Sequence, residues 1–162
     1  MITSFSEFLN ESKKENYLNY YAFDWDDNIL TMPTIIHMEK RSPGGWIPVD
    51  VSTSEFAKIR EDEENWRVIR KSPSLAFSEF NDKGPRGYMA FISDMRKAIK
   101  EETFGPSWND FINCLINGSL FAIITARGHD SKTIRSGVEW IINNYLSKEQ
   151  LYEMYDNLLK FD

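Results

Sequence analysis

Three aspartates, Asp24, Asp26 and Asp27, directly follow the apolar and aromatic residues 20–23. A short apolar run of this kind indicates a buried strand. Because unpaired carboxylates are expensive to bury, we expect the aspartates at the end of that strand. Clustered carboxylates repel each other unless a cation lies between them, and Mg²⁺ prefers oxygen ligands. The segment therefore predicts a metal-assisted site at the carboxyl end of a strand, where open α/β sheets bind ligands.

A second apolar, β-branched run, residues 120–124, ends in Thr125 and is followed by Ala126 and Arg127. The Thr125 hydroxyl and the backbone amides of this turn are suitable donors to phosphate oxygens, and the N-terminus of the next helix favours an anion. Taken alone, each segment has a simpler interpretation. The aspartates could form an acidic turn or a helix cap, and Thr125 could be an ordinary strand residue with a satisfied hydroxyl.

Residues 20–30 resemble motif I of the haloacid dehalogenase (HAD) superfamily, an apolar strand followed by Asp-x-Asp-x-Thr/Val-Leu/Val. The resemblance implies that Asp24 is the nucleophile that takes a phosphoryl group. It implies that Asp26 is the general acid/base, and that both aspartates are ligands of Mg²⁺, the expected cofactor. Asn28 departs from the motif, which usually has Thr or Val at that position.

Residues 120–128 resemble HAD motif II, a strand that ends in Thr or Ser and binds the transferring phosphoryl group. By this resemblance Thr125, Ala126 and Arg127 would bind the substrate. The two motifs together imply an α/β fold with a HAD-like Rossmannoid core. The implied activity is Mg²⁺-dependent hydrolysis of a small-molecule or macromolecular phosphomonoester through an aspartyl-phosphate intermediate.

The region between the two motifs predicts a β-hairpin. Two β-prone runs, residues 34–40 and 46–51, flank the turn residues 42–45. In the HAD fold a hairpin flap follows motif I, and a cap that selects the substrate can follow the flap. We expect a flap and a cap-like insertion at about residues 31–106. Its basic residues could meet a substrate phosphate or form a solvated face: Arg60, Arg67, Arg70, Lys71 and Arg86.

Apolar periodicity and capping residues predict the helices of the chain. We expect helices over residues 52–63, 89–101, 107–117, 130–145 and 147–159, with an apolar stripe on the last one at Leu151, Met154, Tyr155 and Leu158. Residues 17–162 are expected to form the HAD-like unit. Residues 1–16 are expected to form a separate amphipathic segment with Phe5, Phe8 and Leu9 on one face.

The N-terminal segment has two interpretations. It is either a helix that packs on the domain or a targeting peptide. Residues 5–11 are similar to the N-terminal capsid-targeting peptides of some large tailed bacteriophages, in which a prohead protease cuts after a Leu/Ile-x-Glu triplet, here Leu9-Asn10-Glu11. The second interpretation implies a phage capsid as partner, and the host cytoplasm or the virion as location.

Two parts of the HAD pattern are not found in the sequence. No Lys after residue 125 has a persuasive context for holding the phosphoryl group, and no apolar strand ends in a second acidic pair. Only two core strands can be assigned, where a doubly wound sheet needs about five. We therefore expect either a longer natural chain or a partner chain that completes the sheet. The alternative function is a catalytically incomplete HAD-like protein with a binding or virion-packaged role.

Composition narrows the class of protein. With a formal net charge of -6 and an isoelectric point near 5.0, the chain lacks the basic footprint of non-specific nucleic-acid binding. Its single cysteine, Cys114, is expected to be a buried thiol, and one cysteine permits no intrachain disulfide. The N-terminus does not have the pattern of a secretory signal, and no apolar run is long enough to span a membrane. A reducing cytoplasmic setting fits these features.

Overall fold

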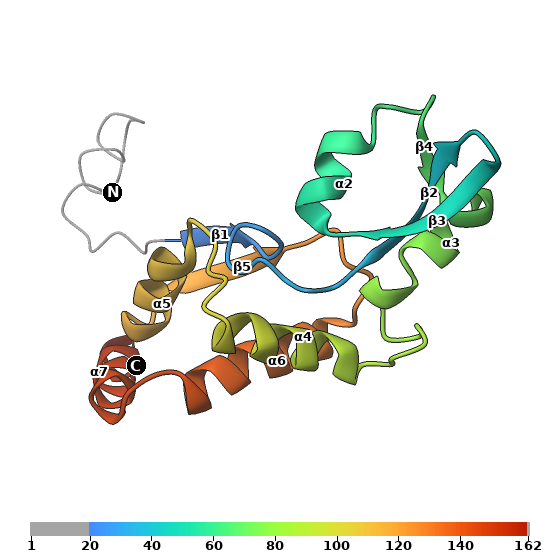
Figure 1. The fold of residues 1–162 in the computed structure, drawn as a ribbon. Coiled ribbons are helices and arrows are strands. Elements are labelled where there is room, and N and C mark those ends of the chain that lie inside the picture. The colour runs from blue at the N-terminus through green and yellow to red at the C-terminus, as the bar shows by residue number, and fades with distance from the viewer. Residues whose placement is uncertain (1–19, 162) are drawn as a thin grey trace, which may run out of the picture.

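A parallel pair of strands and an antiparallel three-stranded sheet organise residues 20–161, the part of the chain that the computed structural model describes (Figure 1). The mixed α/β class predicted from the sequence is confirmed. The strands are β1 Tyr20–Asp24, β2 Ile36–Ser42, β3 Gly45–Val51, β4 Trp66–Val68 and β5 Leu120–Ile124. The α-helices are α2 Thr53–Ile59, α3 Pro73–Ala76, α4 Met89–Lys100, α5 Trp108–Ile116, α6 Ser131–Asn144 and α7 Lys148–Leu158, and the 3-10 helices are η1 Ile69–Lys71, η2 Ser78–Phe80 and η3 Leu159–Phe161.

The parallel pair consists of β1 and β5, in a register that runs from Tyr20 opposite Leu120 to Asp24 opposite Ile124. Side chains alternate across a strand, so one face of the pair packs into the main core and the other does not. The uncovered face carries Tyr20, Leu120 and Ile124, which are 65%, 52% and 63% exposed. Within residues 20–161 neither strand pairs with a second neighbour.

The helices that follow the small sheet cover the inner face of the parallel pair (Figure 1). Trp25, Phe91 and Phe111 are fully buried there, and the rings of Trp25 and Phe91 are 4.9 Å apart. Helices α4 and α6 approach so closely that a Cβ at Gly137 would lie 2.6 Å from the Phe91 ring. Aromatic side chains fill the space between strands and helices, and a small residue lets the two helices meet.

The antiparallel sheet, order β3-β2-β4, belongs to a small lobe, residues 36–80, which also contains α2 and α3. The predicted hairpin is confirmed: β2 and β3 pair from Ile36 opposite Val51 to Ser42 opposite Gly45. Gly45 adopts φ of 119°, which a residue with a side chain rarely tolerates. The lobe has its own buried cluster, made of Ile36, Met38, Val51, Ala76 and Phe80.

The first predicted helix begins as expected, because Ser52 and Glu55 form a capping box. It ends at Ile59, however, and not near residue 63. Asp62 explains the early end. Its carboxylate accepts two hydrogen bonds from the side-chain amide of Asn65, at 3.0 and 3.1 Å, and the chain turns here into β4. Side-chain bonds of this kind compete with helix continuation.

The later helices agree with the sequence in position. The Asp130 and Ser147 side chains cap α6 and α7, whereas Ser107 precedes α5 without a side-chain cap. The predicted stripe of α7 is partly wrong, since Tyr155 and Leu158 are 55% and 45% exposed. Helix α7 packs mainly on α5, a narrow contact that buries Met154 alone among its residues.

Cys114 and the N-terminal segment were also the subject of predictions from the sequence. Cys114 is buried in α5, as predicted, and burial raises the pKa of its thiol to about 11. The amphipathic helix and the targeting peptide expected over residues 1–16 lie outside the described residues. Among residues 20–161 no helix has the length and apolar character needed to cross a bilayer.

Candidate functional site

The carboxyl ends of β1 and β5 bring the two motif segments together. Because the strands are parallel and Asp24 lies opposite Ile124, Asp24 and Thr125 end up at the same edge of the sheet. Phe23 and Trp25 point into the core, with exposed fractions of 5% and 0%. Asp24 therefore faces the exposed side, as the alternation along a strand requires.

The turn that follows β1 is held tightly from the side. Asp27 adopts a left-handed φ of 57°, which aspartate tolerates better than most residues, and its amide donates to the Leu30 carbonyl at 2.9 Å. The Ser107 amide donates to the Asn28 carbonyl at 2.9 Å. Gly105 lies so close that a Cβ there would be 2.2 Å from the Asn28 oxygen. The segment before α5 therefore fixes the turn that carries the aspartates.

Arg127 and Asp26 form a bidentate ion pair inside the site. Arg127 Nε and Nη2 donate to the two carboxylate oxygens at 2.8 and 2.6 Å, and Nη2 also donates to Thr34 Oγ1 at 3.0 Å. The arginine side chain is 1% exposed and the aspartate 19%. The guanidinium lies over the rings of Phe80 and Phe91, at 4.6 and 5.7 Å from their centroids. Arg127 is thus held on three sides and orients Asp26.

A chain of polar contacts continues from this pair toward the small lobe. Thr34 Oγ1 donates to Asp94 at 2.7 Å, and Arg86 donates to both Asp94 oxygens at 2.6 and 3.0 Å. Arg86 also donates to Glu79 at 3.0 Å. The pairing with Asp94 raises the pKa of Arg86 further above its usual value. Buried Asp94 on α4 therefore ties the site to the segment that returns from the small lobe.

Asp24 differs from Asp26 in having no cationic partner within residues 20–161. Burial raises the pKa of the Asp24 carboxyl, the negative charges of Asp26 and Asp27 raise it further, and a backbone hydrogen bond from Trp25 opposes the shift. A nearby cation would favour the ionised form. One oxygen of Asp27 is also buried without a hydrogen-bond partner among the described residues.

His129 is buried behind Arg127 and was not anticipated from the sequence. Neither ring nitrogen has a hydrogen-bond partner among the described residues, and the ring lies 5.2 Å from that of Phe91. Burial lowers the pKa of His129, and the charge of Arg127 lowers it further. Beside it, Asp82 accepts hydrogen bonds from the Asp130 amide at 2.8 Å and the Thr133 hydroxyl at 3.1 Å.

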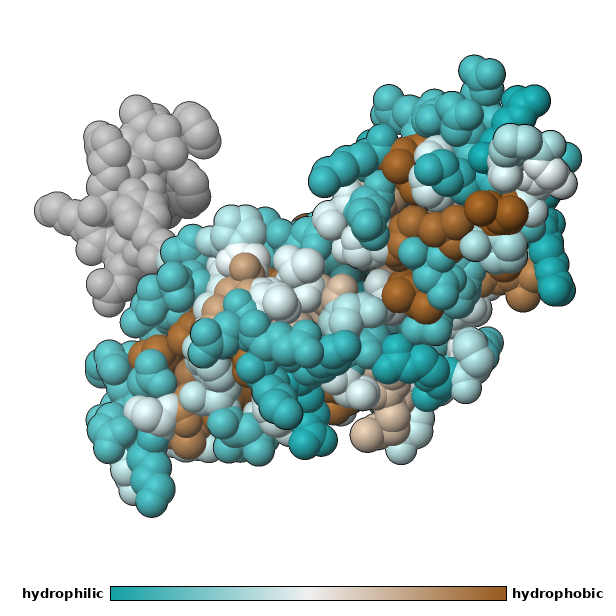
Figure 2. Space-filling view, in the orientation of Figure 1, coloured by the Kyte–Doolittle hydropathy of each residue, from teal (hydrophilic) through white to brown (hydrophobic). Residues whose placement is uncertain are grey.

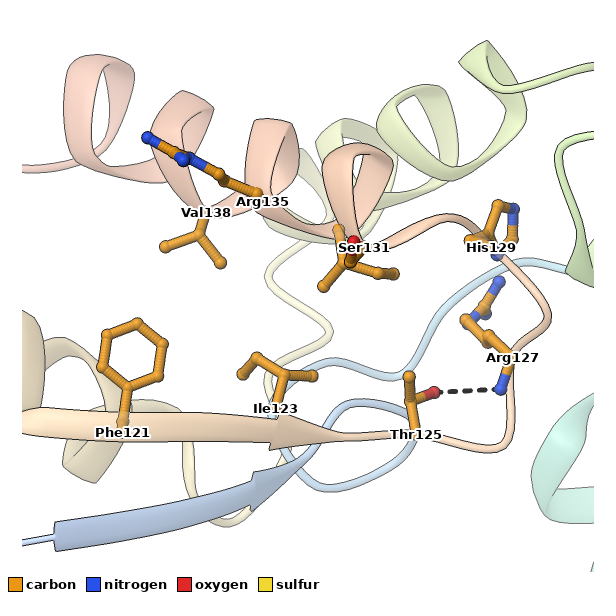
Figure 3. A pocket seen from close by; sticks show the side chains of 9 residues that line it. Phe121, Ile123, Thr125, Arg127, His129, Ser131, Arg135 and Val138 are labelled. Atoms are coloured by element: carbon orange, nitrogen blue, oxygen red, sulfur yellow. Dashed lines mark hydrogen bonds between the residues drawn. The ribbon is translucent and has the colours of Figure 1, made fainter.

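Two pockets meet at Arg127. The first, the β5–α6 pocket, has a volume of about 490 Å³ and lies between strand β5 and helix α6 (Figure 3). Figure 3 shows Thr125, Arg127 and His129 at one end of it and Phe121 at the other. It is lined by Phe121, Ile123, Thr125, Arg127, His129, Ser131, Ile134, Arg135 and Val138.

The second, the lobe pocket, has a volume of about 570 Å³ and lies between the small lobe and the turns after β1 and β5. It is lined by Asp26, Ile36, Thr53, Phe56, Ser74, Phe77, Phe80, Asn81, Ala126, Arg127 and Gly128. The Gly128 amide donates to the Phe80 carbonyl at 2.9 Å, which joins the turn after β5 to the lobe. On the face seen in Figure 2, hydrophobic residues gather on the small lobe within a mostly hydrophilic surface.

The site residues predicted from sequence thus divide into three groups. Asp26 and Arg127 are in direct contact, Asp24 and Thr125 share a sheet edge, and Ala126 lines the lobe pocket. Within residues 20–161, no three His, Cys, Asp or Glu side chains are arranged to hold a metal ion. Mg²⁺ usually keeps several waters and binds one or two protein carboxylates, and of this pair Asp24 is the carboxylate that Arg127 does not engage.

Two of the five basic residues predicted to meet a phosphate or to form a solvated face are engaged with other side chains. Arg67 donates to Glu39 at 2.6 Å and stacks on the Trp46 ring at 4.3 Å, and Arg86 is bound by Asp94. The sequence also missed Thr34 and Asp94, for which it carries no local signal. Comparison with protein-family models, curated proteins and solved structures finds no match to this chain.

Proposed function

We propose that the chain is a Mg²⁺-dependent phosphohydrolase of the HAD type that acts on a phosphomonoester. One observation carries the proposal: the Asp24-x-Asp26 pair and Thr125 lie at adjacent carboxyl ends of two parallel strands. In this proposal β1 and β5 are the first two strands of a HAD-like core, with α4 and α5 in the crossover between them. The small lobe acts as flap and cap.

Asp24 is the proposed nucleophile. One of its carboxylate oxygens attacks the phosphorus atom, the bond from phosphorus to the ester oxygen breaks, and an aspartyl-phosphate forms. Asp26 donates a proton to the departing alcohol and then accepts one from the water that hydrolyses the intermediate. Splitting one difficult displacement into two easier steps is the advantage of covalent catalysis.

The motif II turn is the proposed phosphoryl-binding element. The Thr125 hydroxyl accepts a hydrogen bond from the Arg127 amide at 3.1 Å, and its own hydrogen can donate to a phosphate oxygen. The N-terminus of α6, which follows this turn, favours an anion. Arg127 Nη1 is a buried donor with no hydrogen-bond partner among the described residues. It remains the one nitrogen of this guanidinium that neither Asp26 nor Thr34 engages.

Asp24 and Asp26 are the proposed ligands of Mg²⁺. Burial raises the pKa of Asp24, the charges of Asp26 and Asp27 raise it further, and a bound cation would oppose the shift. When bound, the metal would neutralise negative charge on the phosphoryl oxygens.

The proposal is tested by aryl phosphate hydrolysis with the longest natural form of the protein, with and without Mg²⁺. Turnover is expected only with the metal. Asp24→Asn should lower the turnover rate by several orders of magnitude, as loss of a covalent nucleophile does. Asp110→Asn, on the exposed start of α5, is the matched control and should retain activity. Unchanged turnover in Asp24→Asn would eliminate the nucleophile assignment.

A second candidate function is a catalytically incomplete HAD-like protein with a binding or virion-packaged role. Both Asp26 oxygens already accept hydrogen bonds from Arg127, so neither is available to a leaving group in this arrangement. Under this alternative the chain would bind inorganic phosphate or tungstate with a measurable heat but would not hydrolyse any ester. Metal-dependent turnover that is lost in Asp24→Asn would exclude it.

A further inference from the structure

We propose that the lobe pocket binds the organic part of the substrate, and that this part is an uncharged alcohol carrying a flat ring. The proposal rests on the proposed function, because it assumes that the phosphoryl group is bound at the carboxyl ends of β1 and β5. It adds the chemical class of the leaving group, argued from the position, walls and charge of the pocket.

The position of the lobe pocket is right for a leaving group. Asp26, the proposed proton donor, lines it together with Ala126 and Arg127 of the phosphoryl-binding turn. The β5–α6 pocket reaches Thr125 and Arg127 but neither aspartate of the catalytic pair. To protonate the alcohol, Asp26 must exchange one of its hydrogen bonds from Arg127 for the leaving oxygen, and the alcohol then departs into the pocket that Asp26 lines.

The walls of the lobe pocket are aromatic. Phe56 and Phe77 meet edge to face at 5.4 Å with an interplanar angle of 87°, and Phe77 and Phe80 meet at 5.9 Å and 77°. Phe56 and Phe77 are only half-buried, so their rings keep surface free for a ligand. Aromatic rings gain most from another ring placed against a face or an edge. Three rings from the small lobe thus form one side of the pocket.

The charge of the lobe pocket limits what can enter. Its only charged residues are Asp26 and Arg127, which neutralise each other. The remaining polar side chains are Thr53, Ser74 and Asn81, and the Asn81 amide already donates to the Ser78 carbonyl at 3.2 Å. Among the described lining residues Arg127 is the one cation, and its pairing with Asp26 leaves no further positive charge to hold a second phosphate or a carboxylate. An uncharged ring with few hydrogen-bonding groups fits, and about 570 Å³ leaves room for a bicyclic ring system.

Two matched pairs of ligands test the proposal. Binding of 1-naphthylmethylphosphonate and methylphosphonate is measured by calorimetry. Hydrolysis of 2-(1-naphthyl)ethyl phosphate and ethyl phosphate, two primary alkyl esters of similar intrinsic reactivity, is measured by phosphate release. The ring should improve both affinity and kcat/KM by roughly 10-fold or more, the scale of burying one aromatic ring against others. Equal affinity for the two phosphonates would overturn the proposal.

Variants locate the effect in the lobe pocket. Phe77→Ala should reduce the preference for the ring by roughly 3- to 10-fold. Ser74→Trp fills the pocket from an exposed position and should do the same without removing a core group. Trp46→Ala removes an aromatic side chain of the same lobe that stacks on Arg67 outside the pocket, and should leave the preference unchanged. A ring preference that survives both pocket variants would refute the assignment.

The outcomes separate this proposal from the proposed function. Ring-dependent phosphonate binding with no hydrolysis of either ester would refute the phosphatase and support the pocket. Hydrolysis that is lost in Asp24→Asn but shows no preference for the ring would support the phosphatase and refute the pocket.

Discussion

Replacing Arg127 by methionine should destabilise the protein strongly, because it leaves a buried carboxylate without its partner. Methionine keeps much of the side-chain volume and removes the charge. The change deletes both hydrogen bonds to Asp26, the bond to Thr34, and the cation over Phe80. Removing one partner of a buried ion pair typically costs about 3–5 kcal/mol.

The partial exposure of Asp26 lowers this expected cost in stability. Because 19% of its side chain remains accessible, water can partly solvate the carboxylate in the variant. We therefore expect a loss of about 2–4 kcal/mol in the free energy of unfolding. The assay is urea denaturation at pH 7 followed by far-ultraviolet circular dichroism, with linear extrapolation to water.

Arg135→Met is the matched control. Arg135 lies on α6, its side chain is 80% exposed, and it pairs with Glu139 at 2.7 Å four residues along the helix. Such a surface pair contributes about 0.5 kcal/mol or less. A double-mutant cycle with Asp26→Asn should also give a coupling energy of about 1–3 kcal/mol between Asp26 and Arg127. A cost for Arg127→Met within about 0.5 kcal/mol of the control, the uncertainty typical of such comparisons, would refute the reasoning.

Three further predictions concern the surroundings of the site. Gly105→Ala should cost about 1–3 kcal/mol in urea denaturation, because the new Cβ would lie 2.2 Å from the Asn28 carbonyl oxygen and the backbone must shift; an unchanged midpoint would contradict the close approach. The pKa of His129 is lowered in the folded state, so the stability due to its neutral form is present above about pH 6.5 and is lost as the pH falls below that value. His129→Phe should therefore become more stable relative to the parent protein as the pH is lowered from 7 to 5, measured as the difference between their urea midpoints at each pH. A difference that does not change with pH would contradict this prediction. The raised pKa of Asp24 means that its ionised form destabilises the fold above about pH 4, so Asp24→Asn should raise the melting temperature at pH 7, with the difference vanishing near pH 3; a lower melting temperature at pH 7 would argue against it.

The sequence by itself determined the local elements that carry the site. Apolar runs ending in polar residues were sufficient to predict β1 and β5, and the turn at residues 42–45 was sufficient to predict the hairpin. Capping residues located the starts of α2, α6 and α7. These features depend on side-chain alternation, turn chemistry and hydrogen bonds within a few residues, so a local pattern records them.

The tertiary structure alone decided how these elements act on one another. Arg127 and Asp26 are 101 positions apart, and only the parallel pairing of their strands makes them partners. The lobe pocket likewise forms where the small lobe meets the turns after β1 and β5, so its three phenylalanines could not be assigned to the site from spacing. The periodic pattern also failed to predict that Tyr155 on α7 is exposed, because burial depends on how much of a helix face another element covers. Contacts between distant segments depend on packing of the whole chain, which short-range patterns do not encode.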